Sequence, residues 1–341
     1  MRLKKRLLQA ILFLSLNVVF SQTLTGKLKD RNTNEPIVGA SVYFDNTSYG
    51  TTTNFDGEFS LSLKNEIRSP LVISFVGYES IIFNTIDFDK VYNLSLKPDV
   101  NALEEVVLDS KDEWSRPFKL IQFKREFLGR SEFGQACTIL NEDVLVLNFD
   151  RDTKQLVASS KAPLVINNTA LDYKVRYDLN NFSIVYNMDT ESTLDLEKTY
   201  KTVASVSYSG TTFFEDLPSN KHRKALKNRK EAFTGSALHF MRAVANNRLK
   251  EEKFKIFKGA YQIKPESQIR VFKSDSSEIT EVEIPIKLNI LCKGRQSAIE
   301  SEVKRFQIDV FGNHAPVDKV LFGGFMGNQR MGDALPLNYG L

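Results

Sequence analysis

Short runs of alternating apolar and polar residues, separated by turn residues, occupy residues 25–98. Alternation with a period of two is typical of half-buried β-strands, and closely spaced turn signals are typical of antiparallel sheets. Residues 71–76 are almost continuously apolar, which predicts a central strand, and residues 55–58 read Phe-Asp-Gly-Glu, which predicts a tight turn. Because about seven strands fit in this stretch, the sequence predicts a small β-sandwich.

Residues 1–21 predict a secretory signal peptide that is cleaved before Gln22. Four basic residues stand near the start, and residues 7–20 form a largely apolar stretch. An uncleaved membrane anchor is the alternative, but a spanning helix needs about 20 apolar residues. No cysteine lies near the cut, so a lipid-modified N-terminal cysteine is not expected. We therefore expect an exported protein that lies in the periplasm or is associated with the outer membrane.

The charge balance argues against nucleic acid as a partner. The chain has 46 basic and 42 acidic residues, which gives a net charge of +4. The four excess bases lie in the predicted signal peptide, so the mature chain is expected to be close to neutral. A nucleic-acid-binding protein usually carries an excess of basic residues.

Cysteine and histidine are too sparse to form a zinc motif. Cys137 and Cys292 are the only cysteines, and we expect two buried thiols in separate strands, with a disulfide as the alternative. The three histidines, His222, His239 and His314, lack the spacing of paired metal ligands. We therefore expect no metal and no cofactor.

Four motifs identify the predicted sandwich more closely: GKLKD, PIVGASVYF, GTTTNFDGEFSL and ISFVGYES. In this order they resemble the carboxypeptidase-like regulatory domain, a transthyretin-like sandwich found in exported proteins of Bacteroidota, and we place it at residues 22–98. The resemblance implies no peptidase activity. A zinc carboxypeptidase holds its metal with a paired His-x-x-Glu motif and a further His, and neither His222 nor His239 starts such a pair. In TonB-dependent outer-membrane receptors the same sandwich precedes a plug and a barrel. We expect neither in residues 119–341, because about 220 residues are too few for both.

After a linker predicted at residues 99–118, residues 119–341 predict a second domain that is β-rich but also contains helices. Within the linker, residues 101–108 resemble the short extended segment that follows the sandwich in such receptors. Helical periodicity is present at residues 118–128 and about 230–250, and strand patterns occur at 136–140, 144–149, 156–160 and 164–167. Residues 173–186 predict a hairpin that turns at Asn180 and Asn181, residues 281–291 predict a long strand or a strand pair, and the glycine-rich residues 321–333 predict a flexible loop.

The predicted fold class is thus mainly β. It combines a seven-stranded transthyretin/Ig-like β-sandwich with a β-rich α+β C-terminal domain. Several runs of the second domain, such as RKEAFTGSALHFMRAV, resemble a region that accompanies the sandwich in uncharacterised Bacteroidota envelope proteins. This resemblance implies no chemistry for the region.

No catalytic constellation can be identified by spacing. Ser236 and His239 stand three residues apart, but Ser236 lacks the second glycine of a nucleophile elbow and is better explained as a helix cap. Acidic residues are scattered, and the glycines around Gly324 precede no Lys-Ser or Lys-Thr of a phosphate-binding loop. We therefore predict no catalytic residue.

A basic run at residues 221–230 is the one candidate site. We predict that Lys221, Arg223, Lys224 and Lys227 contact an anionic surface by Coulombic attraction, either peripherally on a membrane with anionic lipid or on a phosphate-bearing glycan. The alternative is a solvated helix face or loop.

These observations predict a non-enzymatic exported cell-envelope protein. The sandwich would act as a docking or adaptor module, and the C-terminal domain would bind an envelope protein or glycan. Two alternatives stay open at this point: an envelope hydrolase with a site that spacing does not reveal, and a small outer-membrane β-barrel, which the alternation at residues 173–188 suggests.

Overall fold

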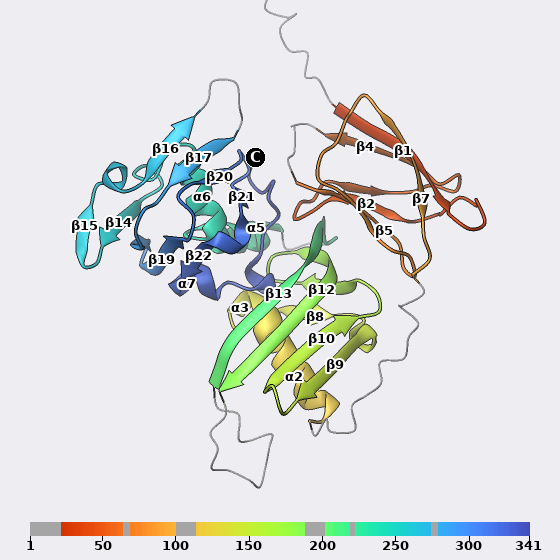
Figure 1. The fold of residues 1–341 in the computed structure, drawn as a ribbon, viewed down its shortest axis with the longest axis horizontal. Coiled ribbons are helices and arrows are strands. Elements are labelled where there is room, and N and C mark those ends of the chain that lie inside the picture. The colour runs from red at the N-terminus through yellow and green to blue at the C-terminus, as the bar shows by residue number, and fades with distance from the viewer. Residues whose placement is uncertain (1–21, 64–68, 100–113, 188–201, 219–221, 274–278) are drawn as a thin grey trace, which may run out of the picture. The chain divides into compact units, whose positions relative to one another are not determined.

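The computed structural model describes residues 22–63, 69–99, 114–187, 202–218, 222–273 and 279–341 (Figure 1). Contacts divide the chain into two units. The first comprises Met1–Val42 and Tyr49–Pro98, and the second comprises Tyr43–Ser48 and Asp99–Leu341. The architecture is mostly β, as predicted. The predicted signal peptide and most of the predicted linker lie outside the described residues.

The N-terminal region forms the predicted sandwich of seven strands in two sheets. One sheet has the order β4-β1-β7, and the other has the order β3-β2-β5-β6. The strands are β1 (Gln22–Asp30), β2 (Ser41–Phe44), β3 (Gly50–Thr52), β4 (Glu58–Leu63), β5 (Leu71–Ser74), β6 (Ile81–Phe83) and β7 (Val91–Leu96).

Alternation along β4 shows how the sequence builds the core of the sandwich. Phe59, Leu61 and Leu63 are buried, while the residues between them are exposed. The turn before this strand ends at Gly57, which has a φ of +73° and donates its N–H to Asn54 O at 2.9 Å. A side chain at Gly57 would also collide with the carbonyl oxygen of Leu28. Glycine at this position therefore follows from both backbone geometry and packing.

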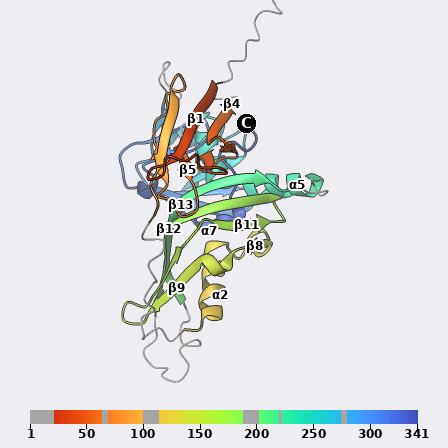
Figure 2. The same ribbon diagram turned by 90° about the vertical axis from the view of Figure 1, so that its right-hand side faces the viewer.

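The second unit contains a large sheet with the order β8-β11-β12-β10-β9, and β13 pairs with β12. Helix α2 (Arg116–Phe127) lies against this sheet (Figures 1 and 2). Phe123 and Phe127 of α2 are fully buried in a core that they share with the inward-facing residues of the strands. The strands are β8 (Cys137–Ile139), β9 (Leu145–Asp150), β10 (Gln155–Ser160), β11 (Leu164–Asn168), β12 (Tyr173–Asn187) and β13 (Thr202–Asp216).

The prediction of a hairpin that turns at Asn180 and Asn181 is wrong, because β12 runs through this position without a turn. On one edge, β13 pairs with β12 along its length, with a register shift between Leu179 and Asn181. On the other edge, β11 pairs with the first half of β12 and β10 with the second half. The two asparagines therefore form a bulge, because pairing on both edges overrides their local preference for a turn.

The remaining elements of the second unit surround a second core. Two sheets have the orders β15-β14-β18-β19-β22 and β16-β17-β20-β21. The core between them includes Phe240, Ile256, Leu288, Ile299 and Phe306. The strands are β14 (Phe254–Lys258), β15 (Tyr261–Ile263), β16 (Arg270–Lys273), β17 (Thr280–Glu283), β18 (Leu288–Cys292), β19 (Arg295–Ser301), β20 (Phe306–Ile308), β21 (His314–Ala315) and β22 (Val320–Gly323).

Short helices connect these sheets. The α-helices are α3 (Glu132–Gln135), α5 (His222–Phe233), α6 (Ala237–Ala245) and α7 (Gly324–Asn328), and the 3₁₀ turns are η2 (Glu142–Val144), η3 (Pro265–Ser267), η4 (Val317–Lys319) and η5 (Met331–Asp333). Residues 281–291, predicted as a long strand or a strand pair, supply β17 and β18, which belong to different sheets.

The helix predicted at about residues 230–250 is in fact two helices. Helix α5 ends at Phe233, and Gly235 has a φ of +74°. Ser236 then caps α6, because its hydroxyl oxygen accepts a hydrogen bond from His239 N at 3.0 Å. The apolar periodicity continues across the break, so it did not reveal the positive φ and the new cap.

Helix α2 begins two residues before its predicted start, inside the segment predicted as a linker. Its N-cap is Ser115, whose hydroxyl oxygen accepts from Phe118 N at 3.4 Å. Pro117 stands in the first turn, where a missing backbone N–H costs nothing. Trp114 is buried and stacks on Phe149 with ring centroids 3.8 Å apart. Trp114, directly before the cap residue, is therefore part of the core that α2 covers.

The prediction of a flexible loop at residues 321–333 is wrong. These residues form most of β22, all of α7 and all of η5. Gly332 donates its backbone N–H to Leu128 O at 2.9 Å, and its carbonyl accepts from Asn168 Nδ2 at 2.9 Å. A Cβ on Gly332 would lie 2.5 Å from the Leu128 oxygen and closer still to the Cα of Gly134. The glycines here permit close backbone packing, and this packing orders the segment.

The two cysteines are free thiols in separate strands, as predicted, but only Cys292 is fully buried and Cys137 is half-buried. Cys137 is in β8 and Cys292 is in β18. Burial raises the pKa of Cys137 to about 12, and burial also raises the pKa of Cys292. Both thiols are therefore protonated at neutral pH and act as small apolar side chains.

We predict that Gly332→Ala lowers the free energy of unfolding by about 1–3 kcal/mol, because its Cβ has no space against Leu128 and Gly134. Gly323→Ala is the matched control, since its Cβ would meet only the Cβ of Ala298, at 3.6 Å. Urea unfolding of both variants measures the difference. Equal stability of the two would contradict the packing argument.

Candidate functional site

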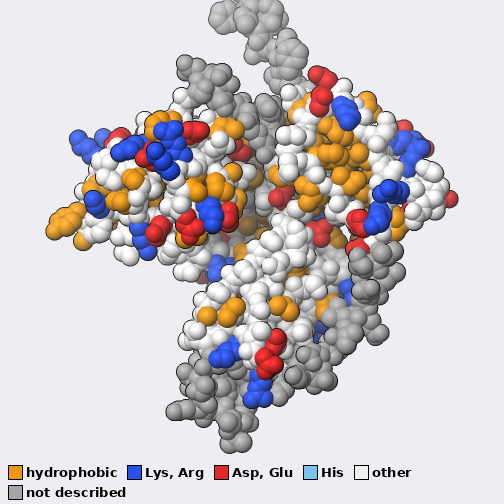
Figure 3. All heavy atoms as spheres, in the orientation of Figure 1, with side chains coloured by type: hydrophobic (Ala, Val, Ile, Leu, Met, Phe, Trp, Pro, Cys, Tyr) orange, Lys and Arg blue, Asp and Glu red, His pale blue; other side chains and the backbone are white. Residues whose placement is uncertain are grey.

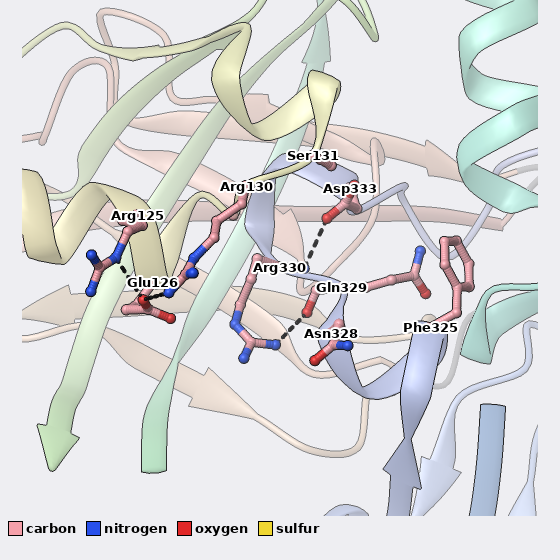
Figure 4. A pocket seen from close by; sticks show the side chains of 10 residues that line it. Arg125, Glu126, Arg130, Ser131, Phe325, Asn328, Gln329, Arg330 and Asp333 are labelled. Carbon is pink, nitrogen blue, oxygen red and sulfur yellow. Dashed lines mark hydrogen bonds and ion pairs between the residues drawn. The ribbon is translucent and has the colours of Figure 1, made fainter. Parts of the chain in front are cut away.

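The pocket that we consider most informative lies between the end of α2 and the C-terminal segment that follows β22 (Figure 4). It has a volume of about 520 Å³. Three arginines from two distant parts of the sequence line it, so we call it the arginine pocket. Its lining consists of Arg125, Glu126, Gly129, Arg130, Ser131, Phe325, Asn328, Gln329, Arg330 and Asp333.

A buried carboxylate organises one side of the arginine pocket. The side chain of Glu126 is only 8% exposed, and its Oε1 accepts from Arg125 Nε at 2.9 Å and from Arg130 Nη2 at 2.7 Å. A buried charge needs such partners to offset its desolvation. The side chain of Arg130 is 65% exposed, so its guanidinium is held by Glu126 and still faces solvent.

Arg330 supplies the opposite side of the pocket. Its Nη1 donates to the carbonyl oxygens of Gly327 and Gln329, both at 2.9 Å, and its backbone N–H donates to Asp333 Oδ2 at 3.1 Å. Within the described part of the chain, no residue accepts from its Nη2. Figure 4 shows the guanidinium groups of Arg130 and Arg330 in the space between Glu126 and Asn328.

An aromatic ring and amide side chains complete the lining. Phe325 of α7 lies under the guanidinium of Arg295, 4.3 Å from its ring centroid. The side chains of Asn328 and Gln329 add amide donors and acceptors (Figure 4). Ser131 mainly has a structural role, because its hydroxyl accepts from Gly134 N at 3.0 Å and caps α3.

A second cavity of about 200 Å³ shares three lining residues with the arginine pocket: Gln329, Arg330 and Asp333. Tyr208 of β13 also lines it, and burial raises the pKa of this tyrosine. The segment around η5 is therefore the wall between two cavities. The position of Arg330 depends on the packing of this wall.

This arrangement suits the binding of an acidic group. Guanidinium groups bind carboxylate, sulfate or phosphate oxygens with two parallel hydrogen bonds. The carboxylate of Glu126 is already paired with two arginines, and Ser131 is a helix cap. Among the described residues, no group of three His, Cys, Asp or Glu side chains is placed to hold a metal ion.

The basic residues predicted as a contact site do not line the arginine pocket. Lys221 lies outside the described residues, and Arg223, Lys224 and Lys227 are exposed residues of α5. The structure places Lys224 at a separate cavity of about 310 Å³. The helix is therefore a second, distinct surface.

Ser236 forms the predicted helix cap, and the ring of His239 is buried. The Ser236 hydroxyl accepts from the backbone of His239, whose ring Nδ1 accepts from Gly235 N at 3.0 Å. The proton of the neutral ring is therefore on Nε2, which lies 3.3 Å from Glu252 Oε2. Burial lowers the pKa of His239, and Glu252 partly opposes this effect.

The sequence reasoning missed the arginine pocket, because its two walls come from segments far apart in the chain: the end of α2 with the turn after it, and the segment from α7 to η5. The one local signal was the series of glycines at residues 323–332. Closely spaced glycines in an otherwise ordered domain can indicate close backbone packing as well as a flexible loop.

Comparison with protein families identifies the N-terminal sandwich. Residues 24–108 match the CarboxypepD_reg-like domain family, as the four motifs implied. The matched family is a regulatory, non-catalytic domain. The match covers only the sandwich and the segment that follows it, so it assigns no family to the second unit.

Two curated relatives match the same part of the chain. TonB-dependent receptor SusC of Bacteroides thetaiotaomicron is 39% identical over 103 residues, which are 30% of this chain and 10% of the receptor. TonB-dependent receptor P39 of Formosa agariphila is 38% identical over 81 residues, which are 24% of this chain and 8% of the receptor. The similarity thus concerns one domain of much longer proteins.

Solved structures add no fold assignment. A protein from Bacteroides uniformis ATCC 8492 is 11% identical and covers 89% of this chain and 98% of that chain, but with a TM-score of 0.17. Within the described residues, none of the helices has the length and apolar character needed to cross a membrane.

We predict that the protein loses stability when the pH falls from about 6.5 to 4, in part through His314. Burial lowers the pKa of His314 to about 4, and its Nε2 has no hydrogen-bond partner among the described residues. The unfolded chain protonates its histidines near pH 6.5, so it binds more protons than the folded chain in this window. Linkage gives a loss of up to about 3 kcal/mol.

Urea unfolding at several pH values compares the wild type with His314→Gln. Glutamine has no charge to bury, so the variant is expected to lose less stability than the wild type between pH 6.5 and 4. Parallel pH profiles of the two proteins would show that His314 does not contribute.

Proposed function

We propose that this protein is a non-enzymatic cell-envelope module whose second unit binds an acidic oligosaccharide in the arginine pocket. The observation that carries the proposal is the position of Arg130 and Arg330, which present guanidinium groups to the same open space. One is held by a buried carboxylate and the other by two backbone carbonyls. Both are therefore positioned before a ligand arrives, which reduces the entropy cost of binding.

The rest of the lining favours a saccharide as the carrier of the acidic group. The volume of about 520 Å³ suits a few sugar rings rather than a folded protein surface. The amides of Asn328 and Gln329 can exchange hydrogen bonds with sugar hydroxyl groups, and the ring of Phe325 offers an apolar face to sugar C–H groups.

The sandwich supports the envelope part of the proposal. Its family occurs in TonB-dependent receptors, and the sequence of residues 1–21 predicts export. We assign the sandwich the role of a docking or adaptor module that holds the second unit near a partner in the envelope. An exported, periplasmic or outer-membrane-associated protein would meet acidic glycans there.

We predict that the protein binds oligogalacturonate or chondroitin sulfate hexasaccharides and that Arg130→Gln weakens this binding about tenfold or more, because a hydrogen bond to a charged group contributes about 1.5–3 kcal/mol. Isothermal titration calorimetry measures the affinity. The neutral oligogalactose is expected not to bind. Arg330→Lys keeps the charge but loses the paired hydrogen bonds, so it is expected to bind more weakly than the wild type.

Arg31→Gln is the matched control, because Arg31 is exposed in the N-terminal sandwich and is not among the residues that line the pocket. Thermal denaturation shows whether each variant is folded. Equal affinity of Arg130→Gln and Arg31→Gln would refute the assignment of the pocket. Release of shortened oligosaccharides by the wild type would instead refute the non-enzymatic role.

A further inference from the structure

Helix α5 has an inner face that is fixed to the second unit. Asn228 Nδ2 donates to Ala170 O at 2.8 Å, and the guanidinium of Arg229 donates to the carbonyls of Leu171 and Asp172 at 2.6 and 2.9 Å. Arg229 also pairs with Asp216 at 2.6 Å and lies over the ring of Tyr173. Arg229, one of the basic residues at 221–230, therefore holds the helix in place and is not available to a partner.

The outer face of the same helix is a stripe of Arg223, Leu226, Lys227 and Lys230. These positions are separated by steps of three, one and three residues, so they lie on one side of an α-helix. All four side chains are exposed. In Figure 2, α5 extends beyond the end of β13, so the helix is at the periphery of the second unit.

The bases of the stripe have no acidic partner within the described part of the chain. Arg229, by contrast, is paired with Asp216. The face of the second unit that is visible in Figure 3 shows basic and acidic side chains close together. Three unpaired bases within eight residues therefore form a local positive field on a chain that is otherwise close to neutral.

Leu226 distinguishes between two kinds of anionic partner. Its side chain is 58% exposed and lies between the bases. A soluble polyanion would interact with the charges and leave this side chain in water. A bilayer offers anionic headgroups together with an apolar interior, so it can accommodate both the bases and the leucine.

We propose that the stripe docks α5 on the surface of an anionic lipid bilayer. The predicted contact of the basic run thus becomes more specific. Of the four residues predicted from the sequence, Arg223 and Lys227 stay in the proposed contact. Lys230 is added as a third base, and Leu226 is added as the apolar anchor. Lys224 points toward the cavity lined by Phe133 and Thr169 instead. The proposal is independent of the arginine pocket, which shares no residue with the stripe.

Vesicle co-sedimentation of the full protein tests this proposal. The vesicles contain phosphatidylcholine with or without phosphatidylglycerol, at low and high salt. The wild type is expected to bind only the phosphatidylglycerol vesicles, and salt is expected to weaken the binding. Each base near an anionic surface gives about a fivefold gain, so Arg223→Gln/Lys227→Gln/Lys230→Gln is expected to bind about 100-fold more weakly.

Lys250→Gln/Lys255→Gln/Lys258→Gln is the control, because it removes the same charge from exposed positions outside α5. It is expected to bind like the wild type. Leu226→Gln is expected to weaken binding about tenfold without changing its salt dependence. Circular dichroism confirms that all variants are folded.

Three results would overturn the proposal. The first is a wild type that does not sediment with phosphatidylglycerol vesicles. The second is equal binding by the two triple variants, which would mean that general charge explains the effect. The third is unchanged vesicle binding by Leu226→Gln together with equally strong binding to soluble dextran sulfate, which would indicate a polyanion site rather than a bilayer site.

Discussion

The close approach of the Gly332 backbone to Leu128 and Gly134 is the contact on which the second unit depends most. It joins the end of the chain to the corner between α2 and α3 through a hydrogen bond of 2.9 Å and through main-chain packing that leaves no space for a side chain. Asn168 secures the same segment from the large sheet. Arg330 stands two residues earlier, so this contact also sets the distance between the two walls of the arginine pocket.

The arginine pocket combines two different ways of holding a guanidinium group. A buried carboxylate holds Arg130, and backbone carbonyls hold Arg330. In both cases the atoms that hold the guanidinium group belong to elements that are packed into the fold. The two guanidinium groups are therefore already in position before a ligand binds. The surface stripe of α5 differs, because its basic side chains are exposed and have no acidic partner among the described residues.

Local patterns in the sequence predicted the sandwich well and the second unit less well. The sandwich strands have neighbours with similar periodicity, and Gly57 marks a turn that depends on its own backbone angle. In the second unit, the outcome at Asn180 and Asn181 was decided by β10, β11 and β13, which are distant in sequence. The break at Gly235 was hidden because the apolar periodicity continues through it. The arginine pocket required a tertiary contact that no local pattern encodes.

The pairing of β12 has a consequence for how the large sheet comes apart. Its first half is bonded to β11 and its second half to β10, while β13 bonds to both halves on the opposite edge. Neither half can detach without breaking ladders on both of its sides, and the other half remains covalently joined to it. The sheet is therefore expected to open as one cooperative unit, with the central amides of β12 exchanging their hydrogens only when the whole sheet unfolds.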